Sequence, residues 1–210
     1  EYVHGSESTL ERNDMLSQED RERFNADLKL VRQILQENRE KGIRKYAMFL
    51  DFDGVIHVFY VQGTPQYEAA MTRMKTKLDF IDPQCLANVD RLTGEFDMDV
   101  IISSSWRYNG LDYCRKYLQK SGMKHVDHVV DTTQDEQFLD RRIEIAEYLI
   151  SHPIYSGFIV LDDIQMKEFE GSYIRINPTV GFDDEKYALA KRILERTDRK
   201  VRKNEMQIIA

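Results

Sequence analysis

Short apolar runs alternate with longer segments of helical periodicity over most of this chain. Each apolar run has the length of a buried strand. We therefore predict strands over residues 47–51, 99–103, 125–130, 158–161 and 173–176. The segments between them predict helices over residues 83–92, 110–121, 136–151 and 183–195. Because strands that alternate with helices form parallel βαβ units, the pattern predicts an α/β fold with a central, mainly parallel sheet.

A further helical pattern precedes the first strand. Ser17 begins a capping sequence, and Gly42 is a natural stop. Between them the apolar side chains fall three or four residues apart, at Phe24, Leu28, Val31 and Leu35. We predict an amphipathic helix over residues 17–41, within an N-terminal extension of residues 1–42. We favour packing of this helix on the rest of the chain, and contact with a protein partner is the alternative.

The remaining boundaries follow from the same pattern. We interpret residues 43–197 as one domain and residues 198–210 as a charged tail. Residues 56–82 show no clear period, since Gly63 and Pro65 interrupt them. Because this segment is too short for a separate domain, we expect a small flap instead of a full cap domain.

Composition and charge narrow the functional classes to which this protein could belong. The net charge of −7 over 210 residues argues against a generic binder of nucleic acid or membranes, although a local basic patch can sit on an acidic protein. The two cysteines, Cys85 and Cys114, lack metal or disulfide spacing and predict free thiols in a reducing, intracellular compartment. We find no apolar run of transmembrane length and no signal peptide. The possibility that a targeting segment before Glu1 has been removed stays open.

Polar side chains crowd the ends of three predicted strands. Asp51 and Asp53 follow the first strand, Ser103, Ser104 and Ser105 follow the second, and Asp162 and Asp163 follow the fourth. In open α/β sheets, ligands bind outside the carboxyl ends of the strands. If these strands are neighbours, their polar groups converge. Carboxylates that lie so close repel one another unless a cation or a proton shares the site, so the pattern indicates a metal-assisted phosphoryl site.

The acidic residues suggest specific roles. We predict Asp51 as the nucleophile, which forms an aspartyl-phosphate, and Asp53 as the general acid and then the general base. Mg²⁺ prefers oxygen ligands, and we expect Asp51, Asp162 and Asp163 to hold it with their carboxylates. Asp53 would add its backbone carbonyl. Gly54 would let the backbone turn close to the phosphate. For each of these aspartates considered by itself, the alternative is a structural role in a turn.

Hydroxyl and cationic groups would hold the phosphoryl oxygens. Ser104 is our first choice for this role, followed by Ser103 and Ser105, and Arg107 could clamp the phosphate with its two-pronged guanidinium. A second cation would balance the transferring charge. The candidates for that cation are Lys124, Arg141 and Arg142, of which we choose Arg141. Solvated surface charge is the alternative for the arginines, and core packing is the alternative for Trp106. His57 lies near Asp53 but has no evident partner.

These motifs resemble those of the haloacid dehalogenase (HAD) superfamily of phosphatases. The first motif stands as Asp51-Phe52-Asp53-Gly54-Val55, the second as Val100–Ser104 and the fourth as Phe158–Asp163. The third motif, a Lys or Arg, is matched by Arg141. The endings Ser104-Ser105-Trp106-Arg107 and Arg141-x-x-Glu144-Ile145 are similar to a subgroup associated with RNA repair. The resemblance implies a Rossmann-like, three-layer fold, dependence on Mg²⁺ and hydrolysis of phosphomonoesters.

The resemblance also bears on the substrate. Members of this family that act on bulky substrates tend to lack a large cap, so analogy favours a macromolecular substrate, such as a phosphoprotein carrying phosphotyrosine, phosphoserine or phosphothreonine. A nucleic-acid end phosphatase is the first alternative, since the subgroup favours it and the net charge weighs against it. A receiver-like phospho-acceptor that signals without turnover is the second. Receivers place the paired acids before the phospho-accepting aspartate, whereas here the pair comes last.

Overall fold

The computed structural model describes residues 17–77, 80–134 and 140–209. Its centre is a sheet of five parallel strands in the order β3-β2-β1-β4-β5. The strands are β1 (Tyr46–Leu50), β2 (Asp99–Ile102), β3 (Val129–Thr132), β4 (Gly157–Asp162) and β5 (Tyr173–Arg175). The predicted α/β class and the parallel sheet are therefore confirmed.

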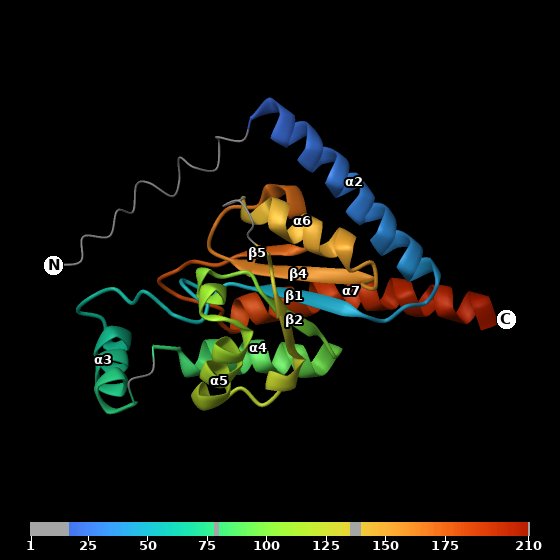
Figure 1. Cartoon of the computed structure of the whole chain (residues 1–210). Helices are drawn as coiled ribbons and strands as arrows, with labels where there is room; N and C mark the ends of the chain where they lie inside the picture. The colour runs from blue at the N-terminus through green and yellow to red at the C-terminus, as the bar shows by residue number, and fades with distance from the viewer. Residues whose placement is uncertain (1–16, 78–79, 135–139, 210) are drawn as a thin grey trace.

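Helices cover both faces of this sheet and make a three-layer fold (Figure 1). The helices are α2 (Gln18–Glu40), α3 (Pro65–Lys77), α4 (Pro83–Phe96), α5 (Leu111–Ser121), α6 (Arg141–Ser151) and α7 (Asp184–Ile209). Short 3₁₀ turns lie at η1 (Ser105–Asn109), η2 (Val126–His128) and η3 (Lys167–Phe169). Successive side chains of a strand point to opposite faces of a sheet. Accordingly, Met48 and Leu50 of β1 pack in the core with α4, α5 and α7, whereas Ala47 and Phe49 pack in the core with α2 and α6.

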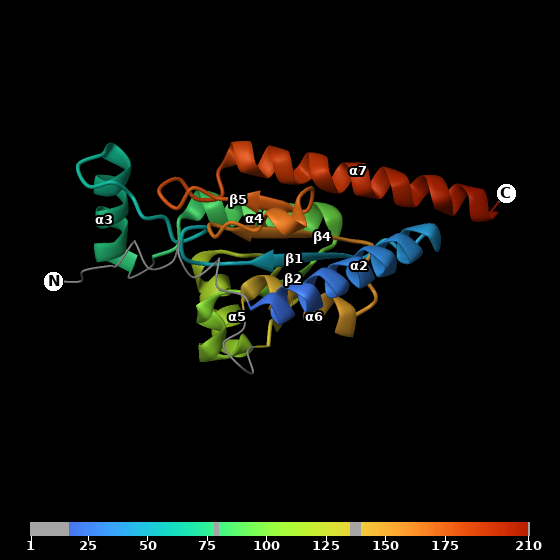
Figure 2. The same ribbon diagram turned by 90° about the horizontal axis from the view of Figure 1, so that it is seen from above.

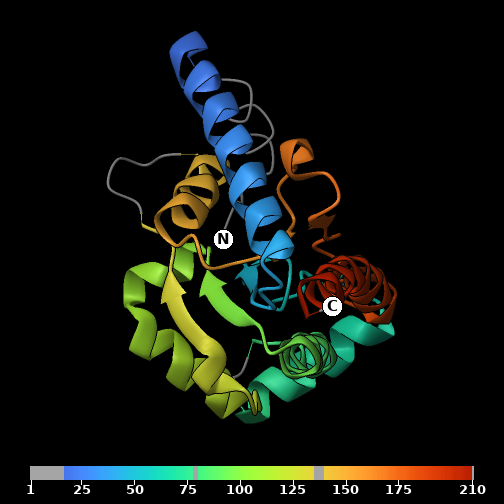
Figure 3. The same ribbon diagram turned by 90° about the vertical axis from the view of Figure 1, so that its right-hand side faces the viewer.

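The N-terminal helix α2 packs on the domain, in agreement with the favoured interpretation. Its apolar stripe, from Phe24 to Leu35, is buried in the core cluster that also contains residues of α6 and β4. Figure 3, which views the molecule from one end, shows α2 running across the layer that holds α6. At the end of the helix, the Asn38 side-chain amide donates to the carbonyls of Pro153 and Tyr155, at 3.1 and 2.7 Å.

Three segments differ from the prediction. Residues 65–77, within the segment without a clear period, form α3, and α3 stands apart from the sheet on the side to which β1 points (Figure 2). The strand expected over residues 125–130 begins only at Val129, because residues 126–128 form a 3₁₀ turn. The last helix does not stop near residue 195 but runs to Ile209. Of the helix expected over 136–151, residues 136–139 lie outside the described residues.

Two features of the charged C-terminal segment tie it to the sheet. Asp198 of α7 accepts hydrogen bonds from the Tyr46 hydroxyl at 2.9 Å and from Arg44 at 3.0 Å, and Val201 is fully buried.

Within the described residues, no helix is both long enough and apolar enough to cross a membrane.

Candidate active site

The register of the sheet brings the predicted site residues together. Leu50 of β1 pairs with Leu161 of β4 on one side and with Ile102 of β2 on the other. The residues that come next in the sequence are Asp51, Asp162 and Ser103 respectively, and they therefore lie at one edge of the sheet. The Asp51 amide donates to Leu161 at 3.1 Å, and the Ser103 amide donates to Leu50 at the same distance. Parallel pairing thus carries side chains from distant parts of the sequence to one place.

Three carboxylates meet at this edge. Ligand oxygens of Asp51, Asp162 and Asp163 all lie within 4.8 Å of one another. Asp51 and Asp162 are buried, and Asp163 is half-buried. Burial, together with the charge of Asp51, raises the pKa of Asp163 to about 6. Burial also raises the pKa of Asp162, against the lowering effect of Arg141. Such shifts disfavour the ionised form of both carboxylates, and a cation bound among them would oppose the shifts.

Arg141 supplies the cation found within this cluster. Its Nη1 atom lies 2.6 Å from Asp162 Oδ2 and 3.2 Å from Asp51 Oδ2. Burial alone would lower the pKa of Arg141, but Asp51 and Asp162 raise it, so the guanidinium stays charged. The other two candidates have different surroundings: Arg142 pairs with Asp140 and Glu168, and Lys124 follows α5 in the loop before β3.

The cluster fits a divalent cation. Among the described residues, Arg141 is the one basic side chain that pairs with this cluster, through Asp51 and Asp162, so two negative charges are left unbalanced when all three carboxylates are ionised. Carboxylate oxygens are the donors that Mg²⁺ prefers. The Asp53 carboxylate is not part of this group of three, and a role for its backbone carbonyl stays a prediction.

Gly54 allows the chain to turn beside this cluster. Its φ angle is +78°, a region that side chains of other residues rarely adopt. A Cβ atom at this position would lie 2.7 Å from Asp163 Oδ2 and 2.9 Å from Pro178 Cβ. Both the backbone angle and the space therefore require glycine here.

The three serines have different surroundings. Ser103 and Ser104 are fully buried, whereas Ser105 is exposed at the start of η1. The Ser104 hydroxyl oxygen accepts a bond from the Trp106 amide at 3.4 Å, as an N-cap does. The Ser103 hydroxyl is buried without a hydrogen-bond partner among the described residues. A buried hydroxyl without a partner is costly unless a ligand satisfies it, so Ser103 is a better candidate than Ser104 for holding a phosphoryl oxygen.

Asp53 belongs to a second group of side chains that the sequence analysis did not anticipate. Its carboxylate lies 2.9 Å from His57 Nδ1 and accepts from the Trp106 indole N–H at 3.2 and 3.3 Å. The hydrogen bond with His57 lowers the pKa of Asp53, although burial opposes the effect. His57 Nε2 in turn lies 3.1 Å from the Tyr117 hydroxyl. His57 is therefore not an isolated histidine, and the spacing of four residues from Asp53 was the available signal.

Arg107 does not extend freely toward a phosphate. Its side chain is buried and pairs with Glu144 Oε1 at 3.0 Å. It also donates to the carbonyls of Ser103 and Ser104, at 3.3 and 3.2 Å. The Glu144 carboxylate accepts a further bond from Thr133. In this arrangement, Arg107 joins the loop after β2 to α6, and its role as a phosphate clamp stays a prediction.

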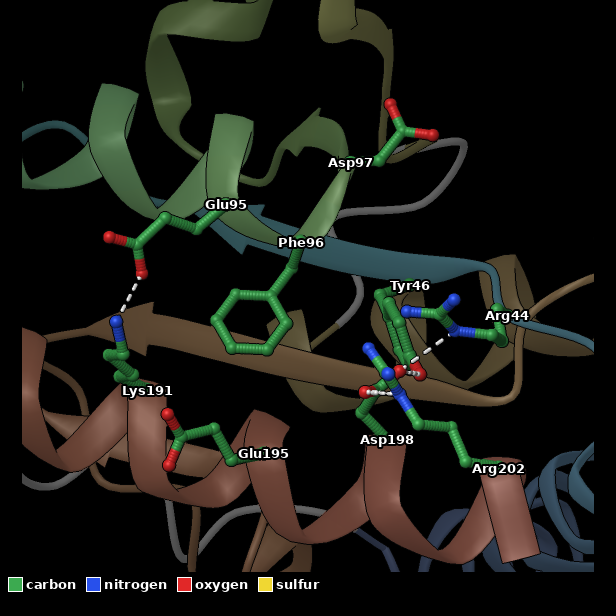
Figure 4. A pocket seen from close by; sticks show the side chains of 9 residues that line it. All are labelled: Arg44, Tyr46, Glu95, Phe96, Asp97, Lys191, Glu195, Asp198 and Arg202. Carbon is green, nitrogen blue, oxygen red and sulfur yellow. Dashed lines mark hydrogen bonds and ion pairs between the residues drawn. The ribbon is translucent and has the colours of Figure 1, made fainter.

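A pocket of about 470 Å³ lies elsewhere, at the opposite end of β1 (Figure 4). Its charged side chains largely satisfy one another: Lys191 pairs with Glu95 at 2.8 Å, and Arg44 and Arg202 pair with Asp198 at 3.0 and 2.6 Å. None of the predicted site residues lines it. Large pockets are the usual first candidates for a ligand site, but here the chemistry gathers at the other end of the strands.

Comparison with known proteins agrees with this geometry. Residues 47–187 match the family model described as the HAD domain in Swiss Army Knife RNA repair proteins. The matched segment contains every residue of the site described above. Searches of curated proteins and of solved structures found no match to this chain.

Proposed function

We propose a function from one premise: this chain belongs to the HAD domain family of Swiss Army Knife RNA repair proteins. The family supports a hydrolase of the phosphatase type. We infer more specifically a Mg²⁺-dependent phosphomonoester hydrolase that works through Asp51. The observation that carries this inference is the meeting of the Asp51, Asp162 and Asp163 carboxylates within 4.8 Å, with Arg141 between Asp51 and Asp162.

The first half-reaction would transfer the phosphoryl group to the protein. A carboxylate oxygen of Asp51 attacks phosphorus, the bond from phosphorus to the leaving oxygen breaks, and an aspartyl-phosphate forms. Asp53 gives its proton to the leaving oxygen. Because the pKa of Asp53 is lowered by its bond with His57, this acid needs a source of protons, and His57 Nδ1 is at 2.9 Å.

The second half-reaction would release phosphate. Asp53 takes a proton from water, the water oxygen attacks phosphorus, and the bond between phosphorus and Asp51 breaks. Arg141 and the Ser103 hydroxyl would hold the oxygens of the phosphoryl group. Asp51, Asp162 and Asp163 would hold Mg²⁺, which supplies positive charge to the transferring group when bound. The role of each of these residues is part of the proposal.

A metal-dependent assay with an aryl phosphate tests this function. We expect turnover with Mg²⁺, loss of turnover after chelation with EDTA and recovery when Mg²⁺ is returned. Asp51→Asn should abolish turnover and leave the fold intact, which circular dichroism would check. Asp53→Asn should slow turnover by about 10²-fold or more, because it removes an acid and a base. Substantial turnover by Asp51→Asn would remove Asp51 as the nucleophile, and a long-lived phosphoenzyme without phosphate release would favour a receiver-like acceptor.

The family description also changes the preferred substrate. The sequence alone favours a phosphoprotein, by analogy with uncapped phosphatases, with a nucleic-acid end as the alternative. Because the family is described by RNA repair, we now propose the phosphorylated end of a nucleic acid. Phosphopeptides compared with phosphorylated oligonucleotides at equal Mg²⁺ test the choice, and efficient turnover of the peptides alone would contradict it.

A further inference from the structure

Two exposed aromatic side chains follow Trp106, the residue that contacts Asp53, and have no part in the mechanism above. Tyr108 and Tyr113 are 63% and 49% exposed. Large aromatic side chains are normally buried because exposing them to water is unfavourable. Both belong to the segment after β2, in η1 and at the start of α5. Figure 2 shows α5 close to the end of the sheet to which β1 points.

The aromatic residues form one continuous array that begins at Asp53. The Trp106 indole, whose N–H contacts the Asp53 carboxylate, stacks on the Tyr117 ring with centroids 5.0 Å apart and planes 10° apart. The Tyr113 ring continues the array, 6.4 Å from Tyr117 and inclined by 21°. It also lies 6.5 Å from the Trp106 ring. The array therefore runs from a carboxylate of the site to a half-exposed ring.

Basic side chains continue the line away from the site. Lys116 and Lys120 are exposed on α5 and follow Tyr113 by three and seven residues, which places all three on one face of the helix. Neither lysine makes a salt bridge with a described residue. At a rise of 1.5 Å per residue, Lys120 lies about 10 Å along the helix from Tyr113. Asp112, Arg115 and Asp127 line the same hollow as Lys116, so the positive charge of this face is carried by lysines that have acidic neighbours.

We propose that this face of α5 binds the end of a single-stranded nucleic acid, with the terminal base stacked on Tyr113 and the following phosphates near Lys116 and Lys120. The inference rests on the proposed function, since Asp53 protonates the leaving oxygen and must contact it. The leaving nucleoside then lies beside Trp106, and Tyr113 is the next ring of the array. Stacked aromatic side chains beside basic residues are the usual means of binding single strands.

The test uses the full chain with Mg²⁺ and short oligoribonucleotides phosphorylated at the 5′ or at the 3′ end. Each is paired with an abasic substrate, in which the terminal nucleotide lacks its base. Tyr113→Ala should lower kcat/KM for the end with a base by between about fivefold and a hundredfold, mainly through KM. That loss should disappear for the abasic end. Tyr113→Phe keeps the ring and should behave as the unchanged protein does.

A matched control and a second readout separate this proposal from the proposed function. Ile154 is also 49% exposed but precedes β4, at the other end of the sheet, and Ile154→Ala should change nothing. Binding of the same oligonucleotides to Asp51→Asn, measured by fluorescence anisotropy, does not depend on turnover. The double variant Lys116→Gln, Lys120→Gln should make that binding less dependent on salt. The slope of the logarithm of the binding constant against the logarithm of salt concentration should fall by about one unit for each phosphate that a lysine no longer neutralises.

The outcomes are distinct. If the end with a base binds more tightly than the abasic end, and only when Tyr113 carries a ring, the proposal stands even if no phosphate is released. If phosphate is released equally fast from ends with and without a base, the proposal that the terminal base stacks on Tyr113 is refuted and the phosphatase function stands. An equal loss on a phosphopeptide after Tyr113→Ala would also overturn the inference, because the surface would then not be selective for a base.

Discussion

Replacing Gly54 by alanine should damage both the fold and the site, by an amount that the structure allows us to estimate. A residue with a Cβ atom at φ +78° costs about 1–2 kcal/mol of stability. The new Cβ would also lie 2.7 Å from Asp163 Oδ2 and 2.9 Å from Pro178 Cβ, and such overpacking typically costs a further ~1–3 kcal/mol. We therefore expect the free energy of unfolding to fall by about 2–5 kcal/mol in total.

Gly63 provides a matched control for that estimate. Its φ angle of +83° is nearly the same, but a Cβ at this position would have no atom within 4 Å. Gly63→Ala should therefore cost only the backbone contribution, about 1–2 kcal/mol. Urea unfolding would give both free energies, and the phosphatase assay would give the turnover of each variant per folded molecule. Equal stability and equal turnover of the two variants would refute the argument that Gly54 is needed for the close approach to Asp163.

Other predictions address the cation, the terminal helices and pH. Arg141→Gln should reduce turnover by about 10²-fold or more, whereas Arg142→Gln should change stability without changing turnover per folded molecule. Phe24→Ala should lower the free energy of unfolding by about 3–5 kcal/mol, because α2 is part of the core; a urea transition unchanged by this variant would make α2 dispensable. Although burial raises it, the pKa of Asp198 is held below its ordinary value by hydrogen bonds, Tyr46 first among them. Asp198→Asn should therefore destabilise the protein by about 1–3 kcal/mol at pH 7, and the difference measured by urea unfolding should vanish as the pH falls through that lowered pKa.

The convergence of the site can be predicted because it depends on backbone rules. Parallel strands end at the same edge of a sheet, so apolar runs that stop at Asp51, Ser103 and Asp162 indicate one site as soon as the strands are neighbours. The sequence does not show which strands pair. The order of the sheet places β1 between β2 and β4, and that order turns three separate strand ends into one cluster.

The errors in secondary structure also have physical causes. The predicted interruption at Pro65 is wrong because proline suits the first turn of a helix, and Pro65 begins α3. The charged residues after 197 suggest a tail because they lack a strong apolar stripe. Lys, Arg and Glu are nevertheless good helix formers, and this part of α7 contacts the domain through the buried Val201 and the hydrogen bonds of Asp198.

The partner of Arg107 could not be predicted from residue types alone. An arginine after a strand that leads to a phosphate site suggests a phosphate clamp, and Glu144 lies too far along the sequence to suggest a partner. In the structure, the two side chains are 8% and 2% exposed and 3.0 Å apart. Removing one partner of a buried ion pair costs about 3–5 kcal/mol, which a single phosphate contact at an open site would hardly recover. Arg107 therefore positions the Ser103–Ser105 loop through its bonds to the carbonyls of Ser103 and Ser104, and we propose Arg141 rather than Arg107 for the contact with phosphate.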